Sequence, residues 1–379
     1  MYTIKTKRNS GYYNGTGCVL FFISAFCILG CSSAASHGAL NGLKIACYII
    51  IPSIFPFTVC SVFFQKSGGL LWVSGKLNKI TKAILNLSGT EFSVILLSLL
   101  GGYPIGAKIT DELYRTNVID KSTSKKLLSF SVNPSPAFII SVVGGSVLNS
   151  VSAGVMLFIS NLTACFILSR LFTLKPKKKT VQISMPISSD VSVSDAFVES
   201  VRSAAEITIN ICAFVVLFAS VAEILKLALS GSLLYSALCP LLEISFGITE
   251  IGKIGIPAHA YSFLLCFGGI STICQVKQAA VNIKPTFKFI VFHRLLHGIT
   301  ATIISFVLFK IFPKSSEVLS NVNEVKLANY PLFLPSVMLI IFSVLFLSFV
   351  ANPKDKKLID IKKKSHYAKK RNSSFQKLN

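Results

Sequence analysis

The stretch LLSLLGGYPIGAK, residues 96–108, places two glycines and a proline between an apolar run and a lysine. Gly101 and Gly102 allow backbone angles that other residues avoid, and Pro104 removes a backbone donor, so the helix is expected to break here. At membrane depth such a break occurs only where it is buried in protein or lines a water-filled cavity. A helix restarting after Pro104 would direct its free N–H groups, with Lys108 one turn further on, at an anion. The alternative is a cytoplasmic loop with Lys108 at the membrane surface.

The composition of the whole chain indicates a membrane protein. Of the 379 residues, 52% are hydrophobic and only 14% are charged, whereas soluble domains carry about 25% charged residues. The 38 Lys and Arg residues exceed the 15 Asp and Glu residues, which gives a net charge of +23. Basic segments between apolar runs are typical of the cytoplasmic loops of polytopic membrane proteins. The composition therefore excludes a secreted domain and a soluble enzyme, and no nucleic-acid partner is expected.

Long apolar runs set the number of membrane spans. A helix that crosses the hydrocarbon core needs about 20 mostly apolar residues, and eight runs meet this requirement. They cover residues 18–36, 45–64, 128–148, 151–171, 207–229, 257–274, 289–309 and 332–350. A ninth run, residues 92–109, has lysines on both sides and is expected to be re-entrant. We therefore predict an all-α polytopic membrane protein with about eight transmembrane helices in two repeat halves, with re-entrant or broken helices.

Basic segments divide the chain and orient it. The predicted order is a basic cytoplasmic N-terminus, a first membrane half, a cytoplasmic linker, a second membrane half and a basic cytoplasmic tail. These parts cover residues 1–16, 17–172, 173–203, 204–351 and 352–379. Because both ends are basic and are expected inside, the number of spans should be even. The first run also resembles a lipoprotein signal that ends at Cys31, but the many later spans favour a retained helix.

Two further breaks interrupt apolar runs. Residues 133–136, Asn-Pro-Ser-Pro, cannot lie inside a continuous helix. Asn133 and Ser135 can cap the resumed helix and hydrogen-bond a ligand, although a plain helix start at the membrane surface is the alternative. Residues 268–275 contain a second Gly-Gly pair, and aligning the two pairs puts Gln275 opposite Lys108. Interrupted segments at corresponding places in two halves are typical of transporters whose site lies at the repeat interface.

The residues expected to contact the substrate lie at these three breaks. They are Gly101, Gly102, Tyr103, Pro104, Gly106, Lys108, Asn133, Ser135, Gly268, Gly269, Ser271 and Gln275. Among the 38 basic residues, Lys108 is the one expected to touch the substrate. The others are expected to orient the chain and to meet anionic membrane lipid.

Other polar residues are assigned no ligand. Glu206 lies near the start of a span, where the helix dipole explains an acidic residue. Glu243 lies in a Gly- and Pro-rich region, where it fits a solvated loop as well as a site. His293 and His297 share a helix face without suitably spaced carboxylates or cysteines, so no metal site is expected. Arg294 beside them indicates an interface position.

No motif for catalysis or cofactor binding is found in the sequence. The chain contains no phosphate-binding loop and no HExxH or GxSxG pattern, so neither an enzyme, nor ATP hydrolysis, nor a cofactor is expected. The ten cysteines lie mostly in apolar runs without metal-ligand spacing, and they are expected to pack as small hydrophobic residues.

Four strings of the sequence resemble one family of membrane proteins. They are IIIPSIFPFTVCSVFF from Ile49, LGGYPIGAKI from Leu100, NPSPAFII from Asn133 and FGGISTICQV from Phe267. They resemble the sporulation integral membrane proteins of the YlbJ type, which belong with the nucleoside-recognition Gate domain membrane proteins. The resemblance runs from about residue 45 to residue 278, and it implies inverted repeats whose helical hairpins meet at the substrate.

The resemblance implies a role in endospore formation, the movement of dipicolinic acid from the mother cell across the outer forespore membrane. Dipicolinate is a small aromatic dianion, so broken-helix N-termini and Lys108 suit its carboxylates and Tyr103 suits its ring. The expected location is multi-pass in the cell membrane, and in the outer forespore membrane during sporulation. The expected partners are this anion and membrane lipid, and a homo-oligomer is compatible with the resemblance.

Two other functions also fit the residues. The Gate superfamily suggests nucleoside transport, for which Asn133 and Gln275 offer polar groups. A membrane assembly factor without transport activity, whose loss blocks spore maturation indirectly, is the second alternative. The residues are compatible with passive transport and with coupling to a proton or sodium gradient.

Overall fold

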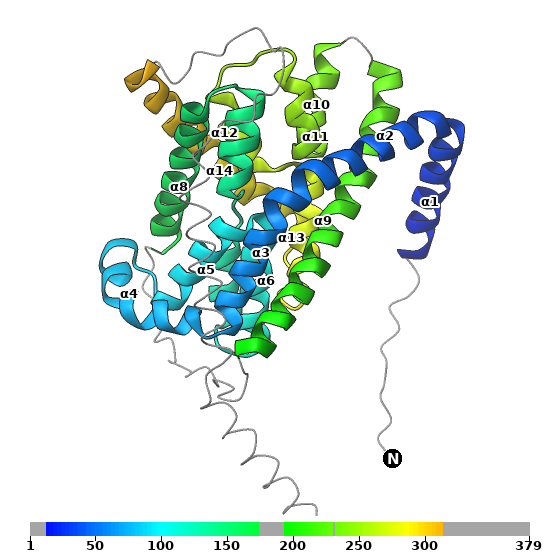
Figure 1. Cartoon of the computed structure of the whole chain (residues 1–379). Coiled ribbons are helices and arrows are strands. Elements are labelled where there is room, and N and C mark those ends of the chain that lie inside the picture. Colours follow the sequence, from blue (N-terminus) through cyan, green and yellow to red (C-terminus); the bar gives the residue numbers. More distant parts are fainter. Residues whose placement is uncertain (1–12, 174–192, 230–231, 314–379) are drawn as a thin grey trace, which may run out of the picture.

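The computed structural model describes residues 13–173, 193–229 and 232–313 of the chain (Figure 1). Every regular element in this part is helical, which confirms the predicted all-α class. The predicted run at 332–350 and the terminal segments 1–12 and 352–379 lie outside the described residues.

Four helical segments are long and apolar enough to cross a membrane. They are Ser32–Lys66, Val151–Phe172 (α8), Val193–Leu229 (α9) and Phe287–Ile311 (α14). The bent pair Trp72–Leu85 and Gly89–Gly101, with 92° between its helices, makes a fifth if it is counted as one span. These described segments confirm a polytopic membrane protein.

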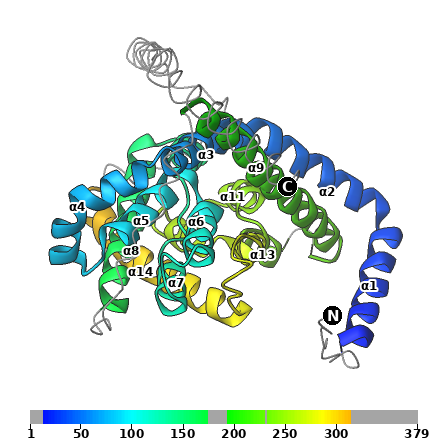
Figure 2. The same cartoon turned by 90° about the horizontal axis from the view of Figure 1, so that it is seen from below.

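The first segment is built from three elements and is preceded by a separate helix. α2 (Ser32–Ile45), a π-helical turn η1 (Ala46–Ile50) and α3 (Ile51–Lys66) follow one another without a gap. α1 (Tyr13–Gly30) ends before Cys31 and lies at an angle to α2, away from the rest of the molecule (Figure 2). The predicted runs 18–36 and 45–64 are therefore divided at Cys31 instead of between residues 36 and 45.

Two of the predicted runs are broken into shorter elements. Residues 128–148 hold the end of α7 (Lys121–Leu128), a non-helical segment and the π-helix η2 (Ala137–Val147). Pro134 and Pro136 account for the non-helical segment, because neither can donate a helical hydrogen bond. The run 257–274 is likewise divided, between α12 (Ala260–Phe267) and α13 (Gly269–Ala279).

α2 and α9 lie side by side along one edge of the molecule (Figures 1 and 2). Two glycines one helical turn apart make the close approach possible. A Cβ on Gly38 would lie 2.6 Å from the carbonyl oxygen of Ala219, and one on Gly42 would lie 2.8 Å from Cα of Val216. This is the small-residue packing that brings helix backbones together in membranes.

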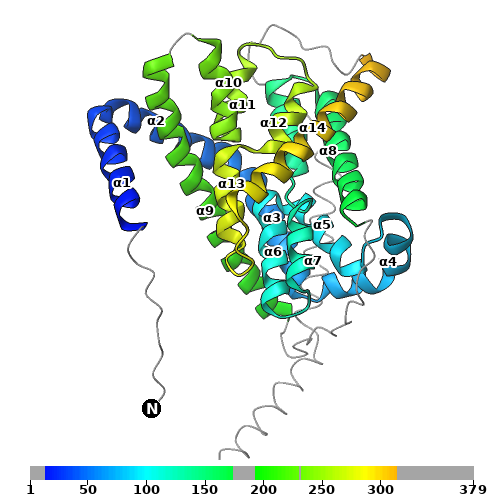
Figure 3. The ribbon, with the colours of Figure 1, turned by 180° about the vertical axis from the view of Figure 1, so that it is seen from behind.

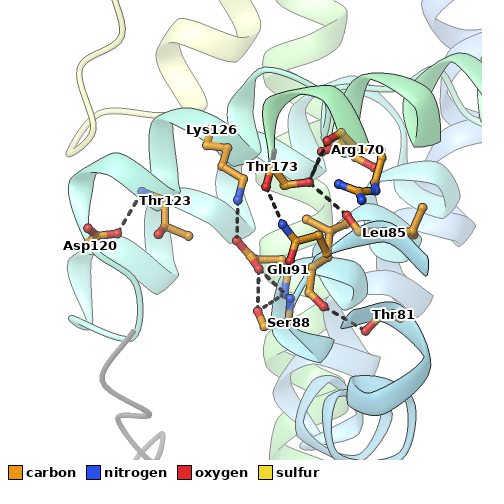
Figure 4. Close-up of polar contacts among 12 residues, drawn as sticks. Thr81, Leu85, Ser88, Glu91, Asp120, Thr123, Lys126, Arg170 and Thr173 are labelled. Carbon is orange, nitrogen blue, oxygen red and sulfur yellow. Dashed lines mark hydrogen bonds and ion pairs between the residues drawn. The ribbon is translucent and has the colours of Figure 1, made fainter. Parts of the chain in front are cut away.

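A polar network fixes the turn between α4 (Gly69–Leu85) and α5 (Gly89–Gly101), as Figure 4 shows. Ser88 caps α5 in a reciprocal capping box with Glu91. The Glu91 carboxylate also lies 3.5 Å from Nζ of Lys126 on α7. Thr173, at the end of α8, donates to the carbonyl of Leu85 at 3.0 Å. The turn is thus held against α7 and α8.

The remaining helices form the middle of the molecule. α6 (Tyr103–Arg115) packs against α13, and Figure 3 shows both near the centre with α7 beside α6. A helical hairpin, α10 (Leu233–Leu242) and α11 (Ile244–Gly252), packs on α13 from the opposite end. The part of the chain before residue 173 therefore contacts the part after residue 193 through α6 and α13, in addition to the contacts of α2 and α3 with α9 and of α8 with α14.

Candidate functional site

The first break separates α5 from α6 at Gly102. Its φ of 87° and ψ of −174° lie in a region that L side chains avoid, so the sequence requires glycine here. α6 restarts at Tyr103, with Pro104 in its first turn, where a missing N–H costs nothing. The predicted break is therefore present, and the N-terminus of α6 begins inside the protein.

The third break repeats this arrangement in the second half. α12 ends at Phe267, and Gly268 and Gly269 both have φ of 79° before α13 continues. A Cβ on Gly269 would lie 3.0 Å from the carbonyl oxygens of Pro240 and Leu242, so the end of α10 rests directly on this break. Both Gly-Gly pairs thus interrupt helices, as the alignment of the two segments predicted.

The second break packs behind the first. Asn133 is fully buried and donates to Oγ of Ser98 at 2.9 Å and to the carbonyl of Phe130 at 3.1 Å. Gly106 of α6 lies against the same segment, because a Cβ there would approach the carbonyl oxygen of Ser131 to 1.7 Å. The side chain of Asn133 therefore ties this segment to α5, and the bare backbone of Gly106 lets α6 approach it closely.

A small cavity joins all three breaks. Its volume is about 30 Å³, which is room for water but not for an aromatic acid. The predicted residues that line it are Gly101, Gly102, Tyr103, Pro104, Ser135 and Gln275. Thr272 and Glu243 add further polar groups, and Phe138 adds an aromatic ring. Elements far apart in the sequence therefore bring half of the predicted substrate residues to one place.

A larger cleft of about 420 Å³ adjoins this cavity and shares Pro104, Ile211 and Gln275 with it. Lys108 lines the cleft and is half-buried. Glu206 lines it too, and the helix dipole does not account for it as expected, because α9 begins at Val193, well before Glu206.

The acidic residues of the cleft are largely engaged with other groups. Glu199 lies 3.8 Å from Lys66, Glu112 accepts from Gln65 at 2.9 Å, and Asp111 accepts from two backbone N–H groups. Within the described part of the chain, no carboxylate lies within 4.0 Å of the Lys108 ammonium. This ammonium is therefore available to an anion that enters the cleft.

The remaining predicted site residues line neither space. They are Gly106, Asn133, Gly268, Gly269 and Ser271. Ser271 is buried and accepts a hydrogen bond of 3.3 Å from the amide of Gln275, so it orients a residue that lines both spaces. The other four shape the breaks through their backbone and packing.

Glu243 is a site residue that the sequence left undecided. It is 1% exposed, and its carboxylate caps α11 by accepting from the N–H of Phe246 at 2.6 Å. A solvated loop is therefore ruled out for this side chain. The signal available in the sequence was an acidic residue directly before an apolar helix, which is typical of an N-cap.

Arg294, for which the sequence indicated an interface position, is buried within the protein. It is only 3% exposed, and its guanidinium lies 5.5 Å from the ring centroid of Tyr103. Tyr103 in turn donates to the carbonyl of Leu265 at 2.6 Å. An ionisable residue inside an apolar span is a candidate functional residue by default. The position of Arg294 within the run 289–309 was therefore a signal in the sequence for a functional role.

Comparison with known proteins gives one informative relative. The chain is similar to the sporulation integral membrane protein YlbJ of Bacillus subtilis (strain 168), with 23% identity over 319 residues. The similarity covers 73% of this chain and 78% of the relative. No protein-family model matches the sequence, and no solved structure matches the chain. The relative supports the YlbJ-type family that the four sequence strings indicate.

Proposed function

We propose that this chain, a homologue of the YlbJ-type sporulation integral membrane proteins, is a transporter of a small organic anion. The proposed substrate is dipicolinic acid, carried across the outer forespore membrane during sporulation. The similarity to a sporulation integral membrane protein supports the sporulation role, and the apolar helices support the membrane location.

The convergence of three interrupted helical segments on one cavity carries this proposal. Non-helical backbone at membrane depth is tolerated where it is buried in protein or lines a cavity, and carriers use such breaks to bind their substrates. The cavity is too small for an aromatic dicarboxylate, whereas the adjoining cleft is not. Transport would therefore require the broken helices to separate, as in an alternating-access carrier.

Two features near the first break favour an anionic substrate, whereas the cleft as a whole is lined by four carboxylates and three cations. α6 begins at a break, and its first residues Tyr103 and Pro104 line the cavity, so the positive end of its helix dipole lies there. The first residues of α13 instead pack against the carbonyl end of α10. Pro104 and Gln275, one from each helix, line both the cavity and the cleft. Lys108 adds a full positive charge on the same side. A carboxylate is the group that these features accommodate together.

A nucleoside is the second candidate, because Glu243 and Gln275 line the small cavity. A carboxylate and an amide suit the hydroxyl groups of a sugar, and Glu243 would repel a nearby anion while ionised. Dipicolinate and a nucleoside can therefore be distinguished by testing whether nucleosides compete with dipicolinate for uptake.

The experiment is uptake of radiolabelled dipicolinate by liposomes that contain the purified full chain, measured with unlabelled dipicolinate, uridine or adenosine as competitor. We expect saturable uptake that dipicolinate blocks and the nucleosides do not. Inhibition by the nucleosides would favour the second candidate. Liposomes that neither bind nor move any of these compounds would instead point to an assembly factor. Repeating the uptake with an imposed proton or sodium gradient identifies the coupling ion.

A further inference from the structure

Arg294 on α14 is a buried cation without an acidic partner in the described part of the chain. Its Nη1 donates to the carbonyl of Val132, and its Nε donates to the carbonyl of Phe267 at 3.3 Å. Its Nη2 is buried and has no hydrogen-bond partner among the described residues. Two neutral carbonyls offset only part of the cost of removing a guanidinium from water.

The groups that hold Arg294 come from three different breaks. Val132 directly precedes the Asn133–Pro136 segment, Phe267 is the last residue of α12 before Gly268, and Tyr103 is the first residue of α6 after Gly102. One side chain therefore connects all three interrupted segments. Arg294 does not act as a surface charge that orients the chain in the membrane, because its side chain is almost completely buried.

Tyr103 separates Arg294 from the candidate site. Its ring contacts the guanidinium, while Tyr103 also lines the small cavity. If the breaks separate, as transport of a substrate larger than the cavity requires, movement of this one residue exposes Arg294 to the site. A second cation then becomes available in addition to Lys108.

We propose that Arg294 binds a carboxylate of the substrate, so that the protein selects dicarboxylates over monocarboxylates. A guanidinium can donate two parallel N–H bonds to a carboxylate, and such charge-assisted bonds are stronger than those to neutral carbonyls. The substrate would thus replace the carbonyls of Val132 and Phe267 and release two of the breaks. This inference rests on the proposed transport of an organic anion.

The test compares dipicolinate with picolinate, which has the same ring and one carboxylate fewer. Binding of each to the purified full chain is measured by displacement of radiolabelled dipicolinate, for the wild type, Arg294→Gln and Arg294→Lys. The matched control is Arg170→Gln, because Arg170 is exposed in the last turn of α8. The ratio of the two affinities is the readout, since a purely structural role of Arg294 would weaken both ligands equally.

The wild type and Arg170→Gln are expected to bind dipicolinate about 10- to 100-fold more tightly than picolinate, as one charge-assisted carboxylate contact implies. Arg294→Gln should reduce this ratio to below about threefold, and Arg294→Lys should give an intermediate value because the charge stays but the paired N–H geometry is lost. A wild-type ratio in either variant overturns the inference while leaving the proposed function intact. If Arg294→Gln does not fold, the ratio of Arg294→Lys decides. Failure of the wild type to bind dipicolinate contradicts the proposed function itself.

Discussion

Lys108 and Arg294 are both positively charged, but they differ in how accessible they are from the cleft. Lys108 lies half-buried in a cleft, where water and an incoming anion can reach it. Arg294 is held behind Tyr103 by backbone carbonyls and is reached only after a rearrangement. The sequence identified the first because it follows a Gly-Gly break. The position of Arg294 inside an apolar run marked it as a candidate, but its contacts with Val132 and Phe267 could not be predicted, because they join residues far apart in the chain.

Substitution of Lys108 by alanine tests the charge in the cleft. We expect the rate of dipicolinate uptake at low concentration to fall about tenfold or more, since one charge-assisted contact is lost. Lys288→Ala is the matched control, because Lys288 is exposed and lines neither the cleft nor the cavity. Unchanged uptake in Lys108→Ala, with normal membrane insertion, would remove Lys108 from the substrate site.

Gly106 gives a sharp test of packing at the first break. A methyl group there would overlap the backbone carbonyl of Ser131, so Gly106→Ala should destabilise the protein by about 3 kcal/mol. Gly75→Ala is the control, because nothing lies within 4 Å of a Cβ at this exposed position of α4. The control should be neutral or slightly stabilising, since alanine favours a helix. Thermal unfolding in detergent measures both, and equal melting temperatures would refute the close approach of α6 to Ser131.

At the scale of elements, local signals predicted where helices break but not how the pieces meet. Positive φ at Gly102 and Gly268 follows from the glycines themselves. α9 begins at Val193, well before the apolar run at residues 207–229. Hydropathy did not predict this early start, because the first turns of the helix are polar. The division of residues 128–148 was expected from two prolines, whereas its π-helical continuation was not. The contacts between helices, which local sequence patterns do not encode, determine how the pieces meet.

Replacement of Gly42 by leucine tests the packing of α2 on α9. The added side chain would meet the backbone of Val216, so the two helices must separate, and we expect a loss of about 1–3 kcal/mol in stability. Gly17→Leu in α1 is the control, because no atom lies within 4 Å of a Cβ there. The apparent melting temperature in detergent should fall for the first variant alone. A similar value for both would show that α2 and α9 are not packed so closely.

At the scale of the molecule, the basic segments share one end. α4, α7 and the first turns of α9 lie toward the lower end of the molecule in Figure 3, and they carry most of the described lysines and arginines between residues 66 and 202. This is the arrangement that the positive-inside rule requires of a cytoplasmic face. The cytoplasmic orientation itself stays a prediction. Charge patterning thus predicted a feature of the whole molecule, whereas the joining of the two halves depended on contacts that no pattern encodes.

Asp111 makes one of the contacts that join the two halves. It is 5% exposed on α6, and it accepts from the backbone N–H groups of Asn282 and Ile283, both at 2.9 Å, beyond the end of α13. Asp111→Ala would leave these donors without a partner and should cost about 3 kcal/mol. Asp111→Asn keeps one acceptor oxygen and should cost less. A melting temperature of Asp111→Ala in detergent equal to that of the wild type would show that Asp111 does not join the halves.

We propose that the three helix breaks form the path of a dicarboxylate through the membrane. The most direct measurement is the initial rate of radiolabelled dipicolinate uptake by liposomes that contain the full chain, compared with protein-free liposomes. We predict uptake that saturates with dipicolinate concentration in the wild type and in Lys288→Ala, and that is reduced about tenfold or more in Lys108→Ala. Uptake no faster than that of protein-free liposomes, from correctly inserted protein, would contradict the claim.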